Sequence, residues 1–258
     1  MPSDTRPTPR SIPTNLRLLV LLEEIAAIGI PVTPADLYGR IDLPKPSLHR
    51  LFVTLEQEGF LERTLDGRKY APAPRLRKLA VMITTAPQQR NEVLLVLQAL
   101  SELIGETCNY SMPERTGMKY VERAETKWPL RFNLPPVGST VPFHCTASGK
   151  CYLASLPPAR LRRLLELIEI KRFTDRTITD LNQLEAQIDT FRAQGFTIDD
   201  QEFMEGMIGL SVGVMIEGRL FGTLSFHAPC QRLDIATAHG HVAEMKRAAE
   251  RIASILVA

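Results

Sequence analysis

The sequence predicts two domains: a mainly α-helical N-terminal domain with the outline of a winged helix-turn-helix, and a larger C-terminal α+β domain built on an antiparallel sheet. The chain has 258 residues, which exceeds the usual size of a single domain. Residues 33–70 hold two short helical segments followed by a hairpin pattern. The remainder mixes hairpins with helices, which is typical of an α+β domain.

The N-terminal end is expected to be a flexible arm over residues 1–13, because it is rich in Pro, Ser and Thr. Residues 14–29 follow as a helix that is apolar on more than one face. Such a helix can bury one face in its own domain and offer the other to a dimer partner.

The helix-turn-helix begins at Thr33, a strong N-cap, with Pro34 at the first helical position and Asp36 completing a capping-box-like arrangement. Leu43-Pro44 breaks the chain, and a second helix begins at Lys45. The inner face of this second helix is expected to be Leu48, Leu51, Phe52 and Leu55.

The outer face of the second helix carries Lys45, His49, Arg50 and Val53, which suits a helix whose N-terminal half enters a DNA major groove. Gly59 is placed to end this helix. Residues 60–70 then read as a two-stranded wing around an Asp66-Gly67 turn. The candidate DNA-contacting residues are Thr33, Lys45, Ser47, His49, Arg50, Arg68 and Lys69.

The charge distribution supports this interpretation. Residues 1–90 contain 13 Lys and Arg against 9 Asp and Glu, a net charge of +4, whereas the remainder has 18 against 20. Caps and surface arginines occur in any small helical domain, but a basic excess at one end favours a DNA reader joined to a second module. The expected macromolecular partner is a double-stranded DNA operator.

The bulk composition excludes several other classes. There is no apolar run of membrane-spanning length and no signal peptide, so we expect a cytoplasmic protein with no membrane partner. Four cysteines, none in a CxxC pair, are expected to be free thiols, and neither a metal site nor a cofactor is expected.

The domain boundaries follow from the same pattern: a DNA-binding domain over 14–73, a linker helix over 74–88 and a second domain over 89–258. The second domain is expected to open with a helix over 90–105 and to close with one over 234–257. The strands expected between them are 107–112, 118–124, 130–134, 196–200, 208–216 and 220–226. The helices expected there are 148–155, 158–170 and 181–193.

Three segments of the second domain, taken together, resemble a known family. They are residues 138–154 (GSTVPFHCTASGKCYLA), residues 195–202 (GFTIDDQE) and the strand that ends at 225–229 (SFHAP). With the N-terminal winged helix, they resemble the IclR family of bacterial transcriptional regulators over nearly the whole chain. The resemblance implies a GAF-like effector-binding domain and homodimers or homotetramers on a partly palindromic operator.

The resemblance also implies a set of effector-binding residues: Asn133, Val141, Ala147, Ser148, Asp199, Gly209, Ser225 and His227. Gly209 stands where a cysteine is frequent and His227 where a small residue is frequent. Each residue also has a purely structural interpretation, because Asn133 could shape a turn, Ser148 could be an N-cap, Asp199 could cap a strand end and His227 could be a satisfied histidine at a sheet edge.

The expected effector is a small organic acid. Residues 146–149 open a helix whose first backbone N–H groups favour an anion. Gly209 is expected to leave room for an aromatic or branched acid, and His227 to add charge below its ordinary pKa of roughly 6.5. Asp199 is expected to bind a ligand hydroxyl or to hold His227.

The main interpretation is a ligand-responsive regulator, which would not be an enzyme. Two alternatives to it remain open. One is an enzyme with a DNA-binding appendage, with Cys145 as a hydrolase-like nucleophile. However, His144 and Cys145 are adjacent on an extended segment and would point to opposite faces. The other alternative is a DNA-binding protein that has no effector.

Overall fold

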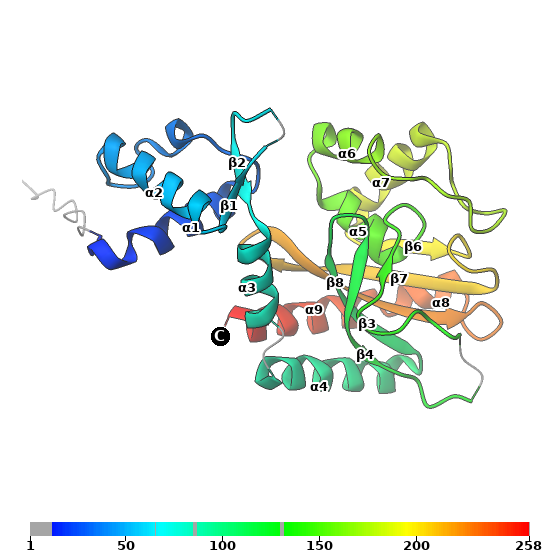
Figure 1. Cartoon of the computed structure of the whole chain (residues 1–258). Helices are drawn as coiled ribbons and strands as arrows, with labels where there is room; N and C mark the ends of the chain where they lie inside the picture. Colours follow the sequence, from blue (N-terminus) through cyan, green and yellow to red (C-terminus); the bar gives the residue numbers. More distant parts are fainter. Residues whose placement is uncertain (1–11, 65, 85–86, 130–131, 258) are drawn as a thin grey trace, which may run out of the picture. The chain divides into compact units, whose positions relative to one another are not determined.

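The computed structural model describes residues 12–64, 66–84, 87–129 and 132–257. The chain forms two compact units, the first ending at Thr84 and the second beginning at Thr85. Figure 1 shows their elements. Most of the expected arm, residues 1–11, lies outside the described residues, as do residues 85–86 of the expected linker helix.

The first unit has the winged helix-turn-helix outline that the sequence predicts. Its elements are η1 (Thr14–Leu16), α1 (Arg17–Ile28), η2 (Pro34–Leu37), α2 (Lys45–Gln57), β1 (Leu61–Arg63), β2 (Tyr70–Pro72) and α3 (Pro74–Thr84). The first helix of the helix-turn-helix is only one 3₁₀ turn, because Tyr38 is already extended. Two glycines with positive φ, Gly29 and Gly59, follow α1 and α2, as expected of C-terminal caps.

The core of the first unit joins α1, α2 and the wing. Leu48, Phe52 and Leu55 recur at helical spacing on α2 and are buried, whereas Leu51 is only half-buried. They pack with Leu21 of α1 and with the wing strands, which pair antiparallel. The opposite side of α2 therefore remains in solvent.

The second unit is an antiparallel sheet with helices on both faces. Its strands are β3 (Thr107–Pro113), β4 (Met118–Ala124), β5 (Thr140–Val141), β6 (Thr197–Asp200), β7 (Met207–Ile216) and β8 (Arg219–Pro229). Its helices are α4 (Pro87–Ile104), α5 (Ala147–Ser155), α6 (Pro158–Leu165), α7 (Leu181–Gln194), α8 (Ile235–Gly240) and α9 (Val242–Val257).

The order of strands across the sheet is β5-β4-β3-β8-β7-β6. On one face α4 and α9 pack against the sheet, and on the other α5 crosses it (Figure 1). Cys108, Tyr110 and Leu224 face α4 and α9 in a large apolar core. The alternate residues of the same strands face α5 and are mostly polar, which makes this second face unusual for a buried layer.

Four details of the second unit differ from the sequence expectation. The strand expected over 130–134 is absent from its described part, 132–134, because Pro135 and Pro136, which follow, have no N–H for a ladder. The helix expected over 158–170 ends at Leu165, after which Ile168 and Ile170 pack back on the core. The closing helix is broken at His241, after Gly240, a poor helix former. The two-residue strand β5 was not anticipated.

Candidate DNA-reading surface and effector site

The outer face of α2 places its predicted DNA contacts together in solvent. Lys45, His49 and Arg50 are exposed in the first two turns, and Ser47 is half-buried. Within the described chain, no hydrogen bond or ion pair engages the Arg50 guanidinium. The helix therefore presents two cations and an imidazole on one surface, as a DNA-reading helix requires.

Tyr38, which the sequence interpretation did not single out, holds two of these side chains. Its hydroxyl is 2.9 Å from His49 Nε2, and the Lys45 ammonium lies 4.9 Å from the centre of its ring. A tyrosine just after the 3₁₀ turn η2 thus orients the residues of α2 that would meet DNA. In the sequence, Tyr38 stands out only as an aromatic residue in a polar turn.

The wing is tied to the C-terminal half of α2. Arg63 Nε donates to Glu56 Oε1 at 3.0 Å, and the Tyr70 hydroxyl donates to Glu56 Oε2 at 3.1 Å. The Asp66 carboxylate shapes the tip, because it accepts from the Thr64 hydroxyl and the Arg68 amide, and these bonds lower its pKa. Arg68 and Lys69 are exposed at this tip.

Thr33 acts first as a cap. Its amide and its hydroxyl both donate to Asp36 Oδ2, at 2.7 and 3.0 Å, and these bonds lower the pKa of Asp36. Because its hydroxyl already has a partner, any contact of Thr33 with DNA would share that group.

The polar face of the sheet brings four of the predicted effector residues together. Asp199, Gly209 and His227 are register partners across β6, β7 and β8. Ser225 lies two residues before His227 on β8 and so faces the same side. Asp199 and Ser225 are fully buried and His227 nearly so.

The first turn of α5 covers this face. Thr146 caps the helix by accepting from the Gly149 amide at 3.0 Å, and Thr197 of β6 donates to the Ala147 carbonyl at 2.6 Å. The amides of Ala147 and Ser148 have no acceptor among the described residues. Two free N–H groups at the positive end of a helix can bind an anion.

Gly209 and His227 fit each other. A Cβ on Gly209 would lie 3.3 Å from His227 Cδ2 and 3.5 Å from Ala147 Cβ. The space that we expected Gly209 to leave for a larger ligand is therefore occupied in part by the imidazole. The two residues fit only as a pair, because a larger residue at 209 would meet the ring at 227.

Asn109 of β3 and Arg123 of β4 fix the orientation of the His227 ring. Arg123 Nε donates to Asn109 Oδ1 at 2.6 Å, so the Asn109 amide nitrogen faces His227 Nδ1, at 3.0 Å. His227 Nδ1 is then the acceptor, and Nε2 carries the hydrogen, which has no partner in the described chain.

Burial, together with the charge of Arg123, lowers the pKa of His227 to about 3. The imidazole is neutral at physiological pH, and the expectation that it gains charge near pH 6.5 is wrong.

Asp199 lies at the opposite end of this row. Its Oδ1 accepts from the amides of Glu202 (2.8 Å) and Phe203 (3.3 Å), whereas Oδ2 has no partner among the residues described. Burial raises its pKa to about 7, although nearby Lys150 acts in the opposite direction. Lys150 is itself buried and paired with Glu202. No hydrogen bond joins Asp199 to His227 in the structure.

Asn133 and Val141 lie outside this group. Asn133 is exposed and lines a polar cavity of about 170 Å³ with Thr107 and Arg123, so it borders the outer side of the Arg123–Asn109–His227 chain. Val141 is buried in an apolar cluster with Met118 and Tyr120. Packing in this apolar cluster is enough to explain why residue 141 is a valine.

Buried polar atoms without partners gather on the face that α5 covers. Six such atoms lie there within the described chain: Ser111 Oγ, Tyr120 OH, Asp199 Oδ2, Thr223 Oγ1, Ser225 Oγ and His227 Nε2. Buried polar groups are almost always satisfied, so this face is one where ordered water or a ligand would supply the partners. The sequence interpretation missed Ser111, Asn109, Tyr120, Arg123 and Thr223, whose only signal is a polar residue at alternate positions of an otherwise apolar strand.

Catalytic and metal chemistry find no support in the described residues. The Cys145 thiol is fully buried, and burial together with Asp199 and Glu202 raises its pKa, so it stays protonated. All four cysteines are free. No group of three His, Cys, Asp or Glu side chains in the described chain could hold a metal ion. None of the described helices is long and apolar enough to cross a membrane.

Two family models match the chain, one on each unit. Residues 16–65 match the IclR helix-turn-helix domain, and residues 88–254 match the C-terminal domain of the bacterial transcriptional regulator IclR.

Curated relatives match over most of their length. One is the probable transcriptional regulator SauR of Cupriavidus necator, 35% identical over 238 residues, covering 92% of this chain and 94% of that protein. Another is the transcriptional repressor IclR of Escherichia coli, 26% identical, covering 89% and 84%. These relatives are regulators, not enzymes.

Solved structures share the fold. The Thermotoga maritima IclR matches with a TM-score of 0.62 at 22% identity, covering 94% of this chain and 98% of that one. An IclR homolog from Microbacterium hydrocarbonoxydans, complexed with 4-hydroxybenzoate, matches with a TM-score of 0.60 at 24% identity and the same coverage.

Proposed function

The chain belongs to the IclR family of bacterial transcriptional regulators, and from this premise we propose that its second unit binds a small organic acid that controls how its first unit binds an operator. The observation that carries the proposal is the set of six unpartnered polar atoms on the sheet face beneath α5. The homolog complexed with 4-hydroxybenzoate supports an organic acid as the class of ligand.

The composition of the site favours an anion with a polar far end. The amides of Ala147 and Ser148, the Ser225 hydroxyl and His227 Nε2–H are all donors that can surround a carboxylate. Asp199 can accept a hydrogen bond from a ligand hydroxyl. It can also donate one when protonated, because its pKa is about 7. A hydroxy acid or a keto acid satisfies both ends.

On DNA, we propose that α2 enters the major groove and that the wing tip follows the phosphate backbone. The surface of η1 and α1 supports a homodimer, because Leu16 of η1 and Leu19 of α1 expose 43% and 56% of their surface. We propose a homodimer, or a dimer of dimers, whose two-fold symmetry would match a partly palindromic operator.

The test is a thermal-shift screen of small carboxylates, aromatic acids and sugar acids, followed by operator binding with each acid that stabilises the protein. A true effector raises the midpoint because it binds only the native state, and it changes operator affinity. An effector-free DNA-binding protein would respond to none of these acids, and that result would overturn the proposal.

A further inference from the structure

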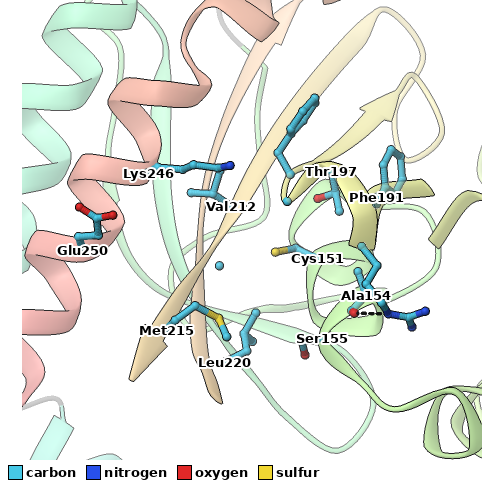
Figure 2. Close-up of a pocket in the computed structure, with 14 residues that line it drawn as sticks. Cys151, Ala154, Ser155, Phe191, Thr197, Val212, Met215, Leu220, Lys246 and Glu250 are labelled. Atoms are coloured by element: carbon cyan, nitrogen blue, oxygen red, sulfur yellow. Dashed lines mark hydrogen bonds between the residues drawn. The ribbon is translucent and has the colours of Figure 1, made fainter. Parts of the chain in front are cut away.

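A second cavity, of about 400 Å³, lies at the β6 edge of the sheet, beyond the last residue pair of β6 and β7. The ladder between β6 and β7 stops at Thr197 and Ser211, so the last part of β7, from Val212, pairs only with β8 in the described structure. The cavity opens beside this free stretch, between α5, the end of α7 and α9 (Figure 2). None of the eight predicted effector residues lines it.

The walls of this cavity, which we call the edge cavity, are mainly apolar. Phe191, Val212 and Leu220 contribute from three different elements, and Cys151 and Ala154 contribute from α5. A volume of this size holds a small organic molecule, for which roughly 300–1,000 Å³ is typical.

Two basic side chains reach the edge cavity, and only one is free for a ligand. The Arg192 guanidinium donates to the carbonyls of Ala154 and Leu156, at 3.0 and 3.1 Å, and is paired with Asp189. The ammonium of Lys246 has no hydrogen bond or ion pair among the described residues. It extends from α9 across the mouth (Figure 2), and its Nζ would lie 3.2 Å from a Cβ on Gly195, at the negative end of α7.

We propose that the edge cavity is a second ligand site, and that it takes a monocarboxylic acid with an apolar chain or ring. The apolar part would lie against Phe191, Val212 and Leu220, and the carboxylate would meet Lys246. Glu250, one turn further along α9, also lines the mouth, so a second negative charge on the ligand would be repelled.

The edge cavity also reaches the first turn of α5. Thr197 lines the cavity, and its hydroxyl donates to the Ala147 carbonyl at 2.6 Å. Cys151 lies one turn after Ala147 on the same helix. A ligand packed on these two side chains would stiffen the turn that presents the Ala147 and Ser148 amides. This coupling rests on the proposed function, whereas binding in the edge cavity does not.

The binding test uses octanoate as the probe and 1-octanol as its uncharged match, titrated calorimetrically into the full chain. We expect Lys246→Gln to weaken octanoate binding about tenfold and to leave octanol binding unchanged. Arg247→Gln removes the same charge from the next residue of α9, outside the cavity, and should leave both unchanged. Ala154→Phe should abolish both by filling the cavity.

The coupling is read by hydrogen exchange, which needs no identified effector. Saturating octanoate should slow exchange of the amides of residues 147–151 in the parent but not in Ala154→Phe, which does not bind it. Unchanged exchange in octanoate-bound parent would overturn the coupling alone.

Several results would overturn the site itself. One is no octanoate binding to the parent, and another is binding by Lys246→Gln and Ala154→Phe that is as tight as the parent's. A third is loss of octanoate binding in Ser225→Ala, which would place octanoate in the effector site and leave the proposed function intact. Dimerisation that Ala154→Phe abolishes, without any octanoate binding, would assign the cavity to a second copy. If octanoate binds as expected but no acid affects operator binding, only the proposed function fails.

Discussion

His227 stands directly opposite Gly209 across β8 and β7, with its imidazole Cδ2 3.3 Å from where a Cβ of residue 209 would be. This contact shapes the proposed effector site, because the ring can keep its place only while residue 209 has no large side chain. The ring is held from behind by Asn109, which is held in turn by Arg123.

The first prediction concerns this pair. Gly209→Leu should displace the His227 ring and abolish the response of operator binding to the effector, while operator affinity without effector stays unchanged. Gly209→Ala is the matched control, because its Cβ meets neighbours at 3.3–3.5 Å and needs only a small adjustment. Operator-binding titrations with and without effector measure both variants. A normal response in Gly209→Leu would show that the ligand does not contact this part of the sheet.

The second prediction concerns pH. The folded pKa of Asp199, about 7, is above its ordinary value of 3.8, so its contribution makes the protein less stable as pH rises from 3.8 to 7. The folded pKa of His227, about 3, is below its ordinary value of 6.5, so its contribution makes the protein more stable as pH rises from 3 to 6.5. Between about pH 4 and 6.5 the two contributions oppose each other.

Removing either group should therefore unmask the other. Relative to the parent, the unfolding free energy of Asp199→Asn should rise with pH between 4.5 and 6.5, and that of His227→Asn should fall. Each difference in slope can reach about 1.4 kcal/mol per pH unit. Urea unfolding at several pH values measures them, and two variants with the parent's slope would mean that neither pKa is shifted as stated.

The third prediction concerns the reading helix. Lys45→Ala and Arg50→Ala should each weaken operator binding, and Arg50→Ala should cost about 1–3 kcal/mol because its exposed guanidinium is free to reach a base or a phosphate. Lys78→Ala, an exposed cation on α3, is the control and should bind as the parent does. Competition binding at fixed, moderate salt measures all three. Full affinity in both α2 variants would mean that another element occupies the groove.

The fourth prediction separates the wing from the helix. Replacing Arg68 and Lys69 with Gln should make the negative slope of log affinity against log salt shallower by about 1–2, since each lost phosphate contact removes about 0.9 from its magnitude. The base preference should not change, because a wing tip that follows the backbone carries no sequence information. An unaltered salt slope would place the wing tip away from DNA.

Local signals allowed much of the fold to be predicted. The Thr33–Asp36 capping box and the turn at Gly67 each depend on neighbouring residues, and both are present. The strand expected over 130–134 is absent from its described part, 132–134, because Pro135 and Pro136, which follow, have no N–H for a ladder. Burial of His227 depends on α5, which is distant in sequence, so neither its low pKa nor the Asn109–Arg123 support could be predicted.

We propose that the effector binds on the polar sheet face beneath α5, and the decisive experiment is calorimetric titration of the identified effector into Ser225→Ala. The hydroxyl removed is buried and has no partner within the described chain, so the variant should fold normally and bind about tenfold more weakly, a loss of roughly 1.4 kcal/mol. Tyr110→Phe is the control, because its buried hydroxyl is equally unpartnered but belongs to the core on the opposite face of the sheet. If the effector binds there, Ser225→Ala should bind it weakly and Tyr110→Phe should bind it with parental affinity. Parental affinity in Ser225→Ala would contradict it.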